Sequence, residues 1–406
     1  MDTDWLAPRM DHLGTNAIRE ILKVVNQPGM ISLAGGIPAP ESFPLDLIET
    51  LTRQALEIFG ASVLQYDATE GFGPLREALA KYLNALGIET ASDQILVASG
   101  SQGVLDAVGK VCIGRGDAVA VEAPTYLGAL QAFSPYGPRY LSLATDGGGV
   151  LPEALEALLE RHPIKLIYLV PTFQNPTGRT LSLARRRTIA ELVQAHDVLL
   201  VEDDPYSALR YRGTPLPPIK SFAPDHVAYI STLSKVFAPG LRIGFVVAPQ
   251  RLRSALVKVK QGVDLHSTTL SQALAAIYLD GGHLKDHLPH ILRLYRPRQS
   301  AMLEALERHF PADFTWSRPE GGMFVWAEGP DGLDMEAVYW QAVERGAAFV
   351  PGKYFYTEPG QGNATMRLNF TMAKPAEIDK AIEVLAGVIK AQPGTRRGAQ
   401  SRRPAA

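Results

Sequence analysis

Residues 198–206 read VLLVEDDPY, four apolar residues that lead directly into three acidic ones. A continuous rather than alternating apolar run is typical of a strand covered on both faces, as in a mostly parallel sheet. Similar runs occur at residues 95–98, 118–121, 166–170, 227–230 and 243–247, and amphipathic stretches such as residues 183–196 lie between some of them. This repetition predicts an open α/β sheet.

The pattern changes beyond about residue 267. A long, charged helical stretch covers residues 284–308, and two further strands, 322–326 and 365–370, flank another helix. We therefore expect a large domain over residues 46–285 and a smaller α+β domain built from residues 31–45 and 286–391. Residues 1–30 are expected to form an N-terminal arm with a helix near residues 17–25. Residues 392–406 are basic and rich in Pro and Gly, which favours a disordered tail.

The charge balance argues against nucleic acid or an anionic membrane as the main partner. Lys and Arg number 40 and Asp and Glu 42, which gives a formal net charge of -2. No window approaches the roughly 18 continuous apolar residues of a membrane span. Cys112 is the only cysteine, which rules out an intrachain disulfide, and the acidic start lacks an apolar signal core. We expect a cytoplasmic protein with no nucleic-acid or membrane partner, and we assign no metal ligands.

Residues 231–244, STLSKVFAPGLRIG, carry the strongest chemical signal. Lys235 stands among small hydroxyl residues and is followed by Arg242. An amine in such a setting can form a Schiff base beside a bound phosphate, and an acid after an apolar strand can pair with a buried pyridinium nitrogen. Those are the two protein groups that pyridoxal phosphate (PLP) requires most.

A phosphate site is predicted where the strand at residues 95–98 ends. The sequence continues as SGSQG before a helix, so small residues let the backbone approach an anion at the helix N-terminus. Ser101 adds a hydroxyl, although many α/β turns look alike. Thr232, Ser234 and Arg242 reach the same edge of the sheet if ligands gather at the carboxyl ends of the strands.

A site for the pyridine ring is predicted beside it. A carboxylate at Asp203 needs a cation to offset its desolvation, although Glu202 and Asp204 compete for this role and a helix cap is an alternative. Asn175 precedes a proline in the run NPTG, which holds it extended with its amide free to donate; a simple turn is the alternative. Tyr206 offers a second donor, and Tyr126 either stacks on the ring or packs in the core.

In combination these residues resemble the class I/II aminotransferase family of fold-type I PLP enzymes, over about residues 12 to 390. The resemblance rests on Ser101-Gln102, the run at 175–178, the run at 203–206, Ser234-Lys235 and Arg367, in the family's order. Residues 32–44, SLAGGIPAPESFP, are similar to the 2-aminoadipate (LysN-like) and kynurenine branch. The resemblance implies a mostly parallel, seven-stranded sheet between helices and a smaller α+β domain.

The resemblance also implies a role for each matching residue. Lys235 would hold the cofactor covalently and move the proton of the substrate. Asp203 would pair with the ring nitrogen, Asn175 and Tyr206 would bind the ring oxygen, and Tyr126 would stack on the ring. The phosphate would be bound by Ser101, Gln102, Thr232, Ser234 and Arg242, with Ser231-Thr232 where Gly-Ser is more usual. Tyr66 would reach the phosphate of a neighbouring subunit, which implies a homodimer with shared active sites.

The expected reaction is a ping-pong transfer of an amino group from an L-amino acid to a 2-oxo acid such as 2-oxoglutarate. Arg367 would bind the substrate α-carboxylate as a bidentate fork, and Gly36 and Asn175 would lie beside it. Arg19 matches an arm arginine that contacts acidic side chains, which favours glutamate and 2-aminoadipate as donors, with aromatic or branched-chain donors as further candidates. A PLP-dependent lyase, decarboxylase or racemase and a non-catalytic PLP-binding sensor, as in MocR-type regulators, are the alternatives.

Overall fold

The central feature is a seven-stranded sheet with the order β2-β10-β9-β8-β7-β3-β4. The computed structural model describes residues 5–7, 9–10 and 29–392. The strands are β2 (Ile95–Ser99), β3 (Ala118–Glu122), β4 (Arg139–Leu143), β7 (Ile164–Leu169), β8 (Leu199–Asp203), β9 (Val227–Thr232) and β10 (Ile243–Val247). Neighbours from β9 to β4 are parallel, whereas β10 runs antiparallel to both β2 and β9. The predicted mostly parallel sheet is therefore confirmed.

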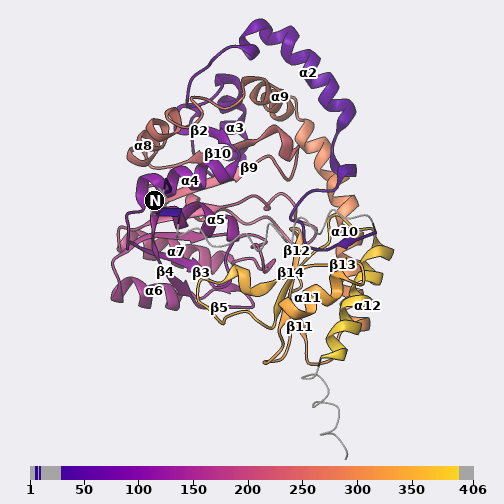
Figure 1. Cartoon of the computed structure of the whole chain (residues 1–406). Helices are drawn as coiled ribbons and strands as arrows, with labels where there is room; N and C mark the ends of the chain where they lie inside the picture. The colour runs from indigo at the N-terminus through magenta and orange to yellow at the C-terminus, as the bar shows by residue number, and fades with distance from the viewer. Residues whose placement is uncertain (1–4, 8, 11–28, 393–406) are drawn as a thin grey trace, which may run out of the picture.

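Helices cover both faces of this sheet, as its continuous apolar strands predict (Figure 1). Along β7, Ile167 and Leu169 pack into a core with α6 (Pro152–Arg161) and α7 (Leu183–Ala195). Leu166 and Tyr168 point the other way, into a core shared with α4 (Ser101–Cys112) and α5 (Leu127–Phe133). The sheet is further surrounded by α3 (Gly73–Ala85), α8 (Gln250–Gln261) and α9 (Thr269–Asp280).

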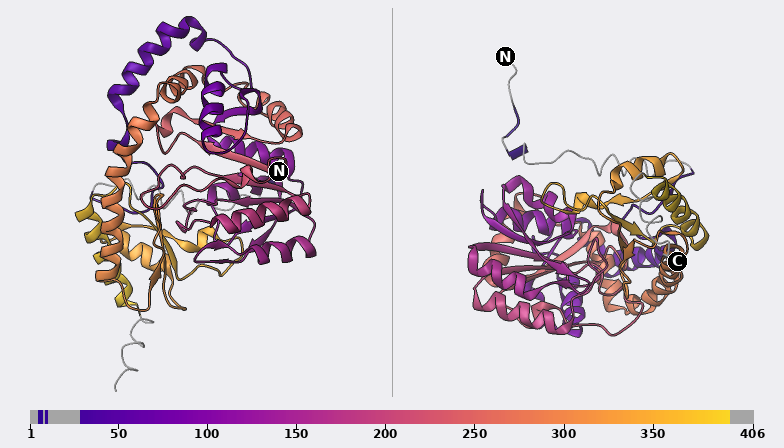
Figure 2. Two further views of the ribbon diagram at one scale, coloured as in Figure 1. Left: turned by 180° about the vertical axis from the view of Figure 1, so that it is seen from behind. Right: turned by 90° about the horizontal axis from the view of Figure 1, so that it is seen from below.

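A second, four-stranded sheet lies beside the first, with the order β11-β12-β15-β14. Its strands are β11 (Thr315–Trp316), β12 (Phe324–Glu328), β14 (Val350–Pro351) and β15 (Thr365–Asn369), and β12 and β15 pair antiparallel. The helices of this part are α11 (Met335–Val343), α12 (Pro375–Ala391) and the 27-residue α10 (His283–His309), which runs between the two sheets' regions (Figures 1 and 2). The sequence predicted this α+β arrangement.

The start of the described chain joins the smaller part. β1 (Ile31–Ser32) pairs in parallel with β13 (Ala347–Ala348), and α2 (Leu45–Phe59) then projects at the edge of the molecule (Figures 1 and 2). A short hairpin of β5 (Thr145–Asp146) and β6 (Gly149–Val150) completes the strands. No helix within the described ranges is long and apolar enough to cross a membrane. The expected N-terminal helix and the tail beyond residue 392 lie outside the described residues.

Candidate active site

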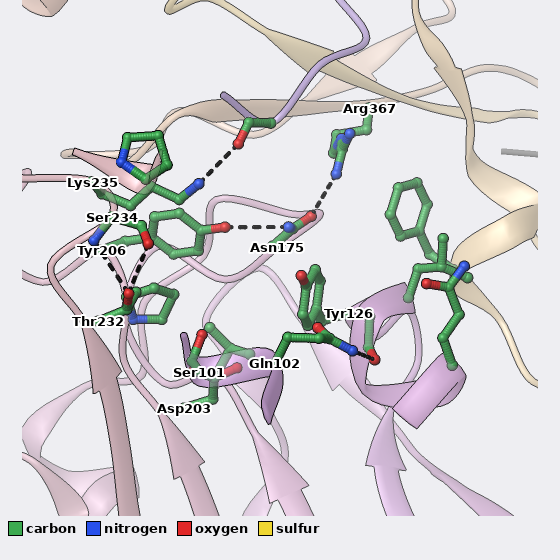
Figure 3. A pocket seen from close by; sticks show the side chains of 18 of the residues that line it. Ser101, Gln102, Tyr126, Asn175, Asp203, Tyr206, Thr232, Ser234, Lys235 and Arg367 are labelled. Carbon is green, nitrogen blue, oxygen red and sulfur yellow. Dashed lines mark hydrogen bonds between the residues drawn. The ribbon is translucent and has the colours of Figure 1, made fainter. Parts of the chain in front are cut away.

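A cavity of about 490 Å³ lies where the carboxyl ends of the parallel strands face the smaller part of the molecule. Because β10 is antiparallel to both neighbours, the ends of β2 and β9 and the start of β10 meet at this same edge. Twelve of the residues predicted from the sequence line the cavity (Figure 3): Gly36, Ser101, Gln102, Tyr126, Asn175, Asp203, Tyr206, Thr232, Ser234, Lys235, Arg242 and Arg367. Thus the fold brings together residues that are scattered along the sequence.

One end of the cavity is shaped for an anion. The chain turns at Gly100, which has a positive φ of 82°, and α4 begins at Ser101 with its free backbone N–H groups at this edge. A Cβ at Gly100 would lie 2.2 Å from Nη2 of Arg242, so only glycine leaves room for the guanidinium. Arg242 donates to the Ser99 carbonyl (3.2 Å) and brings a positive charge to the turn. This combination fits a phosphate.

The hydroxyl residues beside this turn are already linked to one another. Thr232 Oγ1 donates to the carbonyl oxygen of Ile243 at 2.7 Å and lies 2.8 Å from Ser234 Oγ (Figure 3). The Ser234 backbone N–H also donates to Thr232 Oγ1 at 3.2 Å. In this arrangement Thr232 orients Ser234, whereas the sequence suggested only a direct contact between Thr232 and the anion.

Asp203 ends β8 at the floor of the cavity and is 2 % exposed. Burial raises the pKa of its carboxyl to about 7. Oδ2 accepts a hydrogen bond from the Tyr168 hydroxyl at 2.8 Å, and Oδ1 has no partner among the described residues. Strand alternation separates Asp203 from its acidic neighbours: Glu202 accepts from the backbone N–H groups of Ile219 and Lys220 elsewhere. Asp203 is therefore the acid of this run that faces the cavity with an unpartnered oxygen.

Across the cavity, Asn175 connects two other site residues. Its Nδ2 donates to the Tyr206 hydroxyl at 3.3 Å, and its Oδ1 accepts from Nη1 of Arg367 at 2.9 Å (Figure 3). Arg367 is 8 % exposed, and its guanidinium lies over the rings of Phe324 (4.4 Å) and Phe355 (5.0 Å). Burial lowers the pKa of Arg367 to about 10, and its Nε has no partner in the described part of the chain. Such a charge favours a carboxylate ligand.

Lys235 extends into the same space from the loop after β9. Its Nζ donates to the carbonyl oxygen of Gly36 at 2.9 Å (Figure 3). Burial, together with the positive charges of Arg367 and Arg242, lowers the pKa of its amine to about 8. An amine with this pKa is partly uncharged near neutral pH, so it can act as a nucleophile or a base.

These residues fit pyridoxal phosphate as the cofactor. The unpartnered Oδ1 of Asp203 matches the protonated ring nitrogen, and the turn at Gly100 with Arg242 matches the phosphate. Asn175 and Tyr206 offer polar groups for the ring oxygen, and Tyr126 places its ring beside the cavity, next to Gly128, where a Cβ would lie 2.4 Å from the tyrosine. Lys235 supplies the amine.

One predicted site residue lies away from the cavity, and one falls outside the described residues. Tyr66 does not line the cavity, and its side chain is 77 % exposed. Arg19 lies outside the described residues. Other lining residues were missed, because nothing in their sequence context signals a ligand: Leu127, Gly128, Gln131, Val170, Pro205, Pro239, Val350 and Phe355. Tyr168 was also missed, although a hydroxyl within a fully apolar strand indicates a buried hydrogen-bond partner.

The fold and the site define a PLP-dependent transferase of fold-type I, and comparison with known proteins specifies it further. Residues 30–385 match the family model of aminotransferase class I and II, so the chain belongs to this family and is a PLP-dependent transaminase. It is 44 % identical to aromatic-amino-acid aminotransferase 1 of Thermococcus litoralis over 95 % of this chain and 96 % of that protein.

Solved structures of similar proteins agree. The kynurenine aminotransferase of Pyrococcus horikoshii, in complex with PMP, is 42 % identical and superposes with a TM-score of 0.92 over 95 % of this chain and 97 % of that chain. LysN, the α-aminoadipate aminotransferase of Thermus thermophilus complexed with N-(5'-phosphopyridoxyl)-L-leucine, is 37 % identical, with a TM-score of 0.88 and the same coverage.

Proposed function

We propose that this aminotransferase moves the amino group of an aromatic or acidic L-amino acid to a 2-oxo acid such as 2-oxoglutarate. The observation that carries this proposal is the buried guanidinium of Arg367, which shares one cavity with the amine of Lys235. A 2-amino acid and a 2-oxo acid both carry a carboxylate next to the reacting carbon. One arginine can therefore hold either substrate with that carbon near the amine.

Each residue contributes a distinct step to the proposed mechanism. PLP, when bound, supplies an aldehyde that takes up the amino group and a ring that withdraws electrons from the substrate. Arg367 binds the substrate carboxylate, and Asn175 keeps the guanidinium in place through the 2.9 Å bond from Nη1. Lys235 would remove the proton from the substrate α-carbon and deliver it to the cofactor carbon that carried the aldehyde, so that the nitrogen stays with the cofactor. Asp203 would hold a positive charge at the ring nitrogen.

The cavity supports more than one class of amino donor. Apolar side chains of Leu127, Val350 and Phe355 line it together with the polar side chain of Gln131. An aromatic or aliphatic side chain would bury apolar area there, and the amide N–H of Gln131 would donate a hydrogen bond to an acidic side chain. The relatives' names, which include aromatic amino acids, kynurenine and α-aminoadipate, support the same range. The proposed contact between Arg19 and acidic donors remains part of this hypothesis.

A half-reaction without any oxo acid tests the proposal. The PLP-loaded protein is mixed with single L-amino acids, including phenylalanine, kynurenine, 2-aminoadipate, glutamate and leucine, and its absorbance spectrum is followed. We expect conversion of the cofactor to its amine form, fastest with aromatic and acidic donors. In the Lys235→Ala variant, the rate of this conversion should fall about 10²–10⁴-fold, because the proton-transfer base is absent. Bound PLP that no donor converts would instead favour a lyase or a sensor.

We also propose a homodimer with shared active sites. Exposed apolar side chains gather on α2 and just after it: Leu45, Leu56, Ile58, Leu64 and Tyr66. Apolar groups of this size on a projecting helix are typical of an interface, and a second copy of the chain would cover them. Tyr66 would then reach the phosphate end of the partner's cavity.

The domain division and the location of the protein complete the proposal. The two separate sheets and their helices support a large domain over residues 46–285 and a small one over residues 31–45 and 286–391, and we propose this division. The single cysteine supports a reducing compartment, and we propose the cytoplasm.

A further inference from the structure

A buried tyrosine lies behind Asp203, and none of the roles assigned so far uses it. Tyr168 is fully buried on β7 and does not line the cavity. Its hydroxyl donates to Oδ2 of Asp203 at 2.8 Å, which is the single hydrogen bond of this side chain within residues 29–392. The two carboxylate oxygens therefore differ, since Oδ2 is held from behind and Oδ1 has no partner in that range.

The position of this tyrosine is set by the sheet. β7 and β8 are parallel neighbours, and Tyr168 pairs with Val201, two residues before Asp203. Residues two apart on a strand face the same side, so the long side chain of Tyr168 reaches forward to the carboxylate. The ring of Phe133 packs edge-on against Tyr168 at 5.9 Å between centroids and supports the tyrosine ring from one side.

The charge on Asp203 depends on this contact. Burial raises the pKa of Asp203, the hydrogen bond from Tyr168 lowers it, and the neighbouring charge of Asp204 raises it, which together give a pKa of about 7. The other titratable groups that interact with Asp203 are the hydroxyls of Tyr126 and Tyr206, whose own pKa values lie above 10 because they are buried. Among these groups, Tyr168 alone donates a hydrogen bond to the carboxylate.

We propose that Tyr168 is a positioning residue for the cofactor: its hydroxyl holds Oδ2 of Asp203, so that the carboxylate stays ionised and presents Oδ1 to the pyridine nitrogen. The proposal rests on the PLP site described above and adds a residue to it. Removing the hydroxyl takes one charge-assisted hydrogen bond from a buried carboxylate. By the usual strength of such a bond, PLP affinity should fall roughly 10- to 100-fold.

The chain contains a matched control for this proposal. Tyr229, on β9, is 1 % exposed, and its hydroxyl donates to Oδ2 of Asp204 at 2.9 Å. This pair matches Tyr168 and Asp203 in residue types and burial and lies on the same sheet, but neither Tyr229 nor Asp204 lines the cavity. Tyr229→Phe therefore reports the general effect of removing a buried hydroxyl from a tyrosine–aspartate pair, and it leaves the pair of Tyr168 and Asp203 intact.

The experiment measures the Kd of PLP for the full-length wild type, Tyr168→Phe and Tyr229→Phe between pH 5.5 and 8.5, with thermal unfolding of each. We expect both variants to remain folded and Tyr168→Phe alone to bind PLP more weakly. As the pH falls, affinity should be lost at a higher pH in Tyr168→Phe than in the wild type. The carboxyl of the variant has a higher pKa, and once it is protonated it no longer offers a negative charge to the ring nitrogen.

A double-mutant cycle separates a positioning effect from a packing effect. Tyr168→Phe added to Asp203→Asn should leave the Kd of PLP within about twofold of Asp203→Asn alone, if the tyrosine acts through the carboxylate. Equal losses in Tyr168→Phe and Tyr229→Phe, an unchanged pH profile, or additive effects in the cycle would overturn the proposal. Should Tyr168→Phe be unfolded, Tyr168→Met, which also lacks the hydroxyl donor but fills much of the same space, serves for the same pH profile. Failure of the wild type itself to bind PLP would refute the proposed site instead.

Discussion

At the scale of single residues, the cavity holds three buried or half-buried ionisable groups whose pKa values are displaced towards neutrality. Burial raises the pKa of Asp203 to about 7 and lowers those of Lys235 to about 8 and Arg367 to about 10. Each matches a different ligand group. Asp203 can pair with a cationic ring nitrogen, Lys235 can react with an aldehyde, and Arg367 can bind a carboxylate. Strongly displaced pKa values that cluster in one cavity are typical of an active site.

Arg367 provides the sharpest prediction at this scale. Its fork donates to Asn175 and to the carbonyl oxygen of Ala34, and it lies over two aromatic rings. Arg367→Lys keeps a positive charge but loses the planar pair of donors. We expect the KM for amino donors to rise about 100-fold, or roughly 2–3 kcal/mol of binding, while the absorbance of bound PLP is unchanged. Steady-state kinetics measure this, and an unaltered KM would exclude Arg367 as the carboxylate ligand.

At the scale of elements, the antiparallel strand β10 shapes the turn at Gly100, where we expect the phosphate to bind. Gly244 of β10 faces the turn so closely that a Cβ would lie 2.3 Å from the backbone of Gly100 and Ser101. Because Gly244 pairs with both Ala98 of β2 and Thr232 of β9, the strand cannot move away without breaking two ladders. The shape of the turn thus depends on a glycine far away in the sequence.

Gly244→Ala should therefore damage the site through the backbone. We expect the added methyl group to displace the turn, to lower the free energy of unfolding by about 1–3 kcal/mol and to weaken PLP binding. Gly103→Ala is the control, since a Cβ there meets nothing within 4 Å and lies within α4. Urea unfolding and PLP titration of both variants measure the effects. Equal PLP affinity in Gly244→Ala and the wild type would show that the turn tolerates the shift.

The sequence predicted the positions of the strands along the chain better than their directions within the sheet. Residues 243–247 were expected as a strand and form β10, but an apolar run looks the same in either direction, so the antiparallel placement had no signal. Similarly, the run 202–204 left three candidate acids, and strand alternation with the partners of Glu202 and Asp204 leaves Asp203 facing the cavity. The contact with Tyr168 depends on the register of β7 against β8, which propensity and periodicity do not specify.

At the scale of the whole molecule, the cavity closes only when both parts of the chain are present. Arg367 comes from β15 of the smaller part, Asn175 from the loop after β7, and Ala34 from the segment after β1. The three meet in one hydrogen-bonded group, so the relative position of the two sheets sets the distance between the carboxylate site and Lys235. In the proposed homodimer, the exposed Tyr66 would extend this principle to a second copy of the chain.

Mixing two inactive variants tests the shared site. Lys235→Ala removes the amine, and Tyr66→Ala removes a group that, in the proposed dimer, serves the partner's cavity. After the two proteins are unfolded and refolded together, half of the dimers should be mixed, and each mixed dimer has one intact site. About one quarter of wild-type activity should therefore return. No recovery over the separate proteins would show that Tyr66 acts within its own subunit or not at all.

The pairing of β1 with β13 has a consequence for how the protein is made. Ile31 is synthesised long before its partner Ala347. The seven strands of the larger sheet all lie between them, so that sheet can form while the first strand still waits. Since loop closure over such a distance is entropically costly and slow, we expect the smaller part to assemble only after the strands from Ala347 onward have been synthesised. Until then, Arg367 does not line the cavity, and a nascent chain that has already bound PLP would lack the arginine proposed to bind the substrate carboxylate.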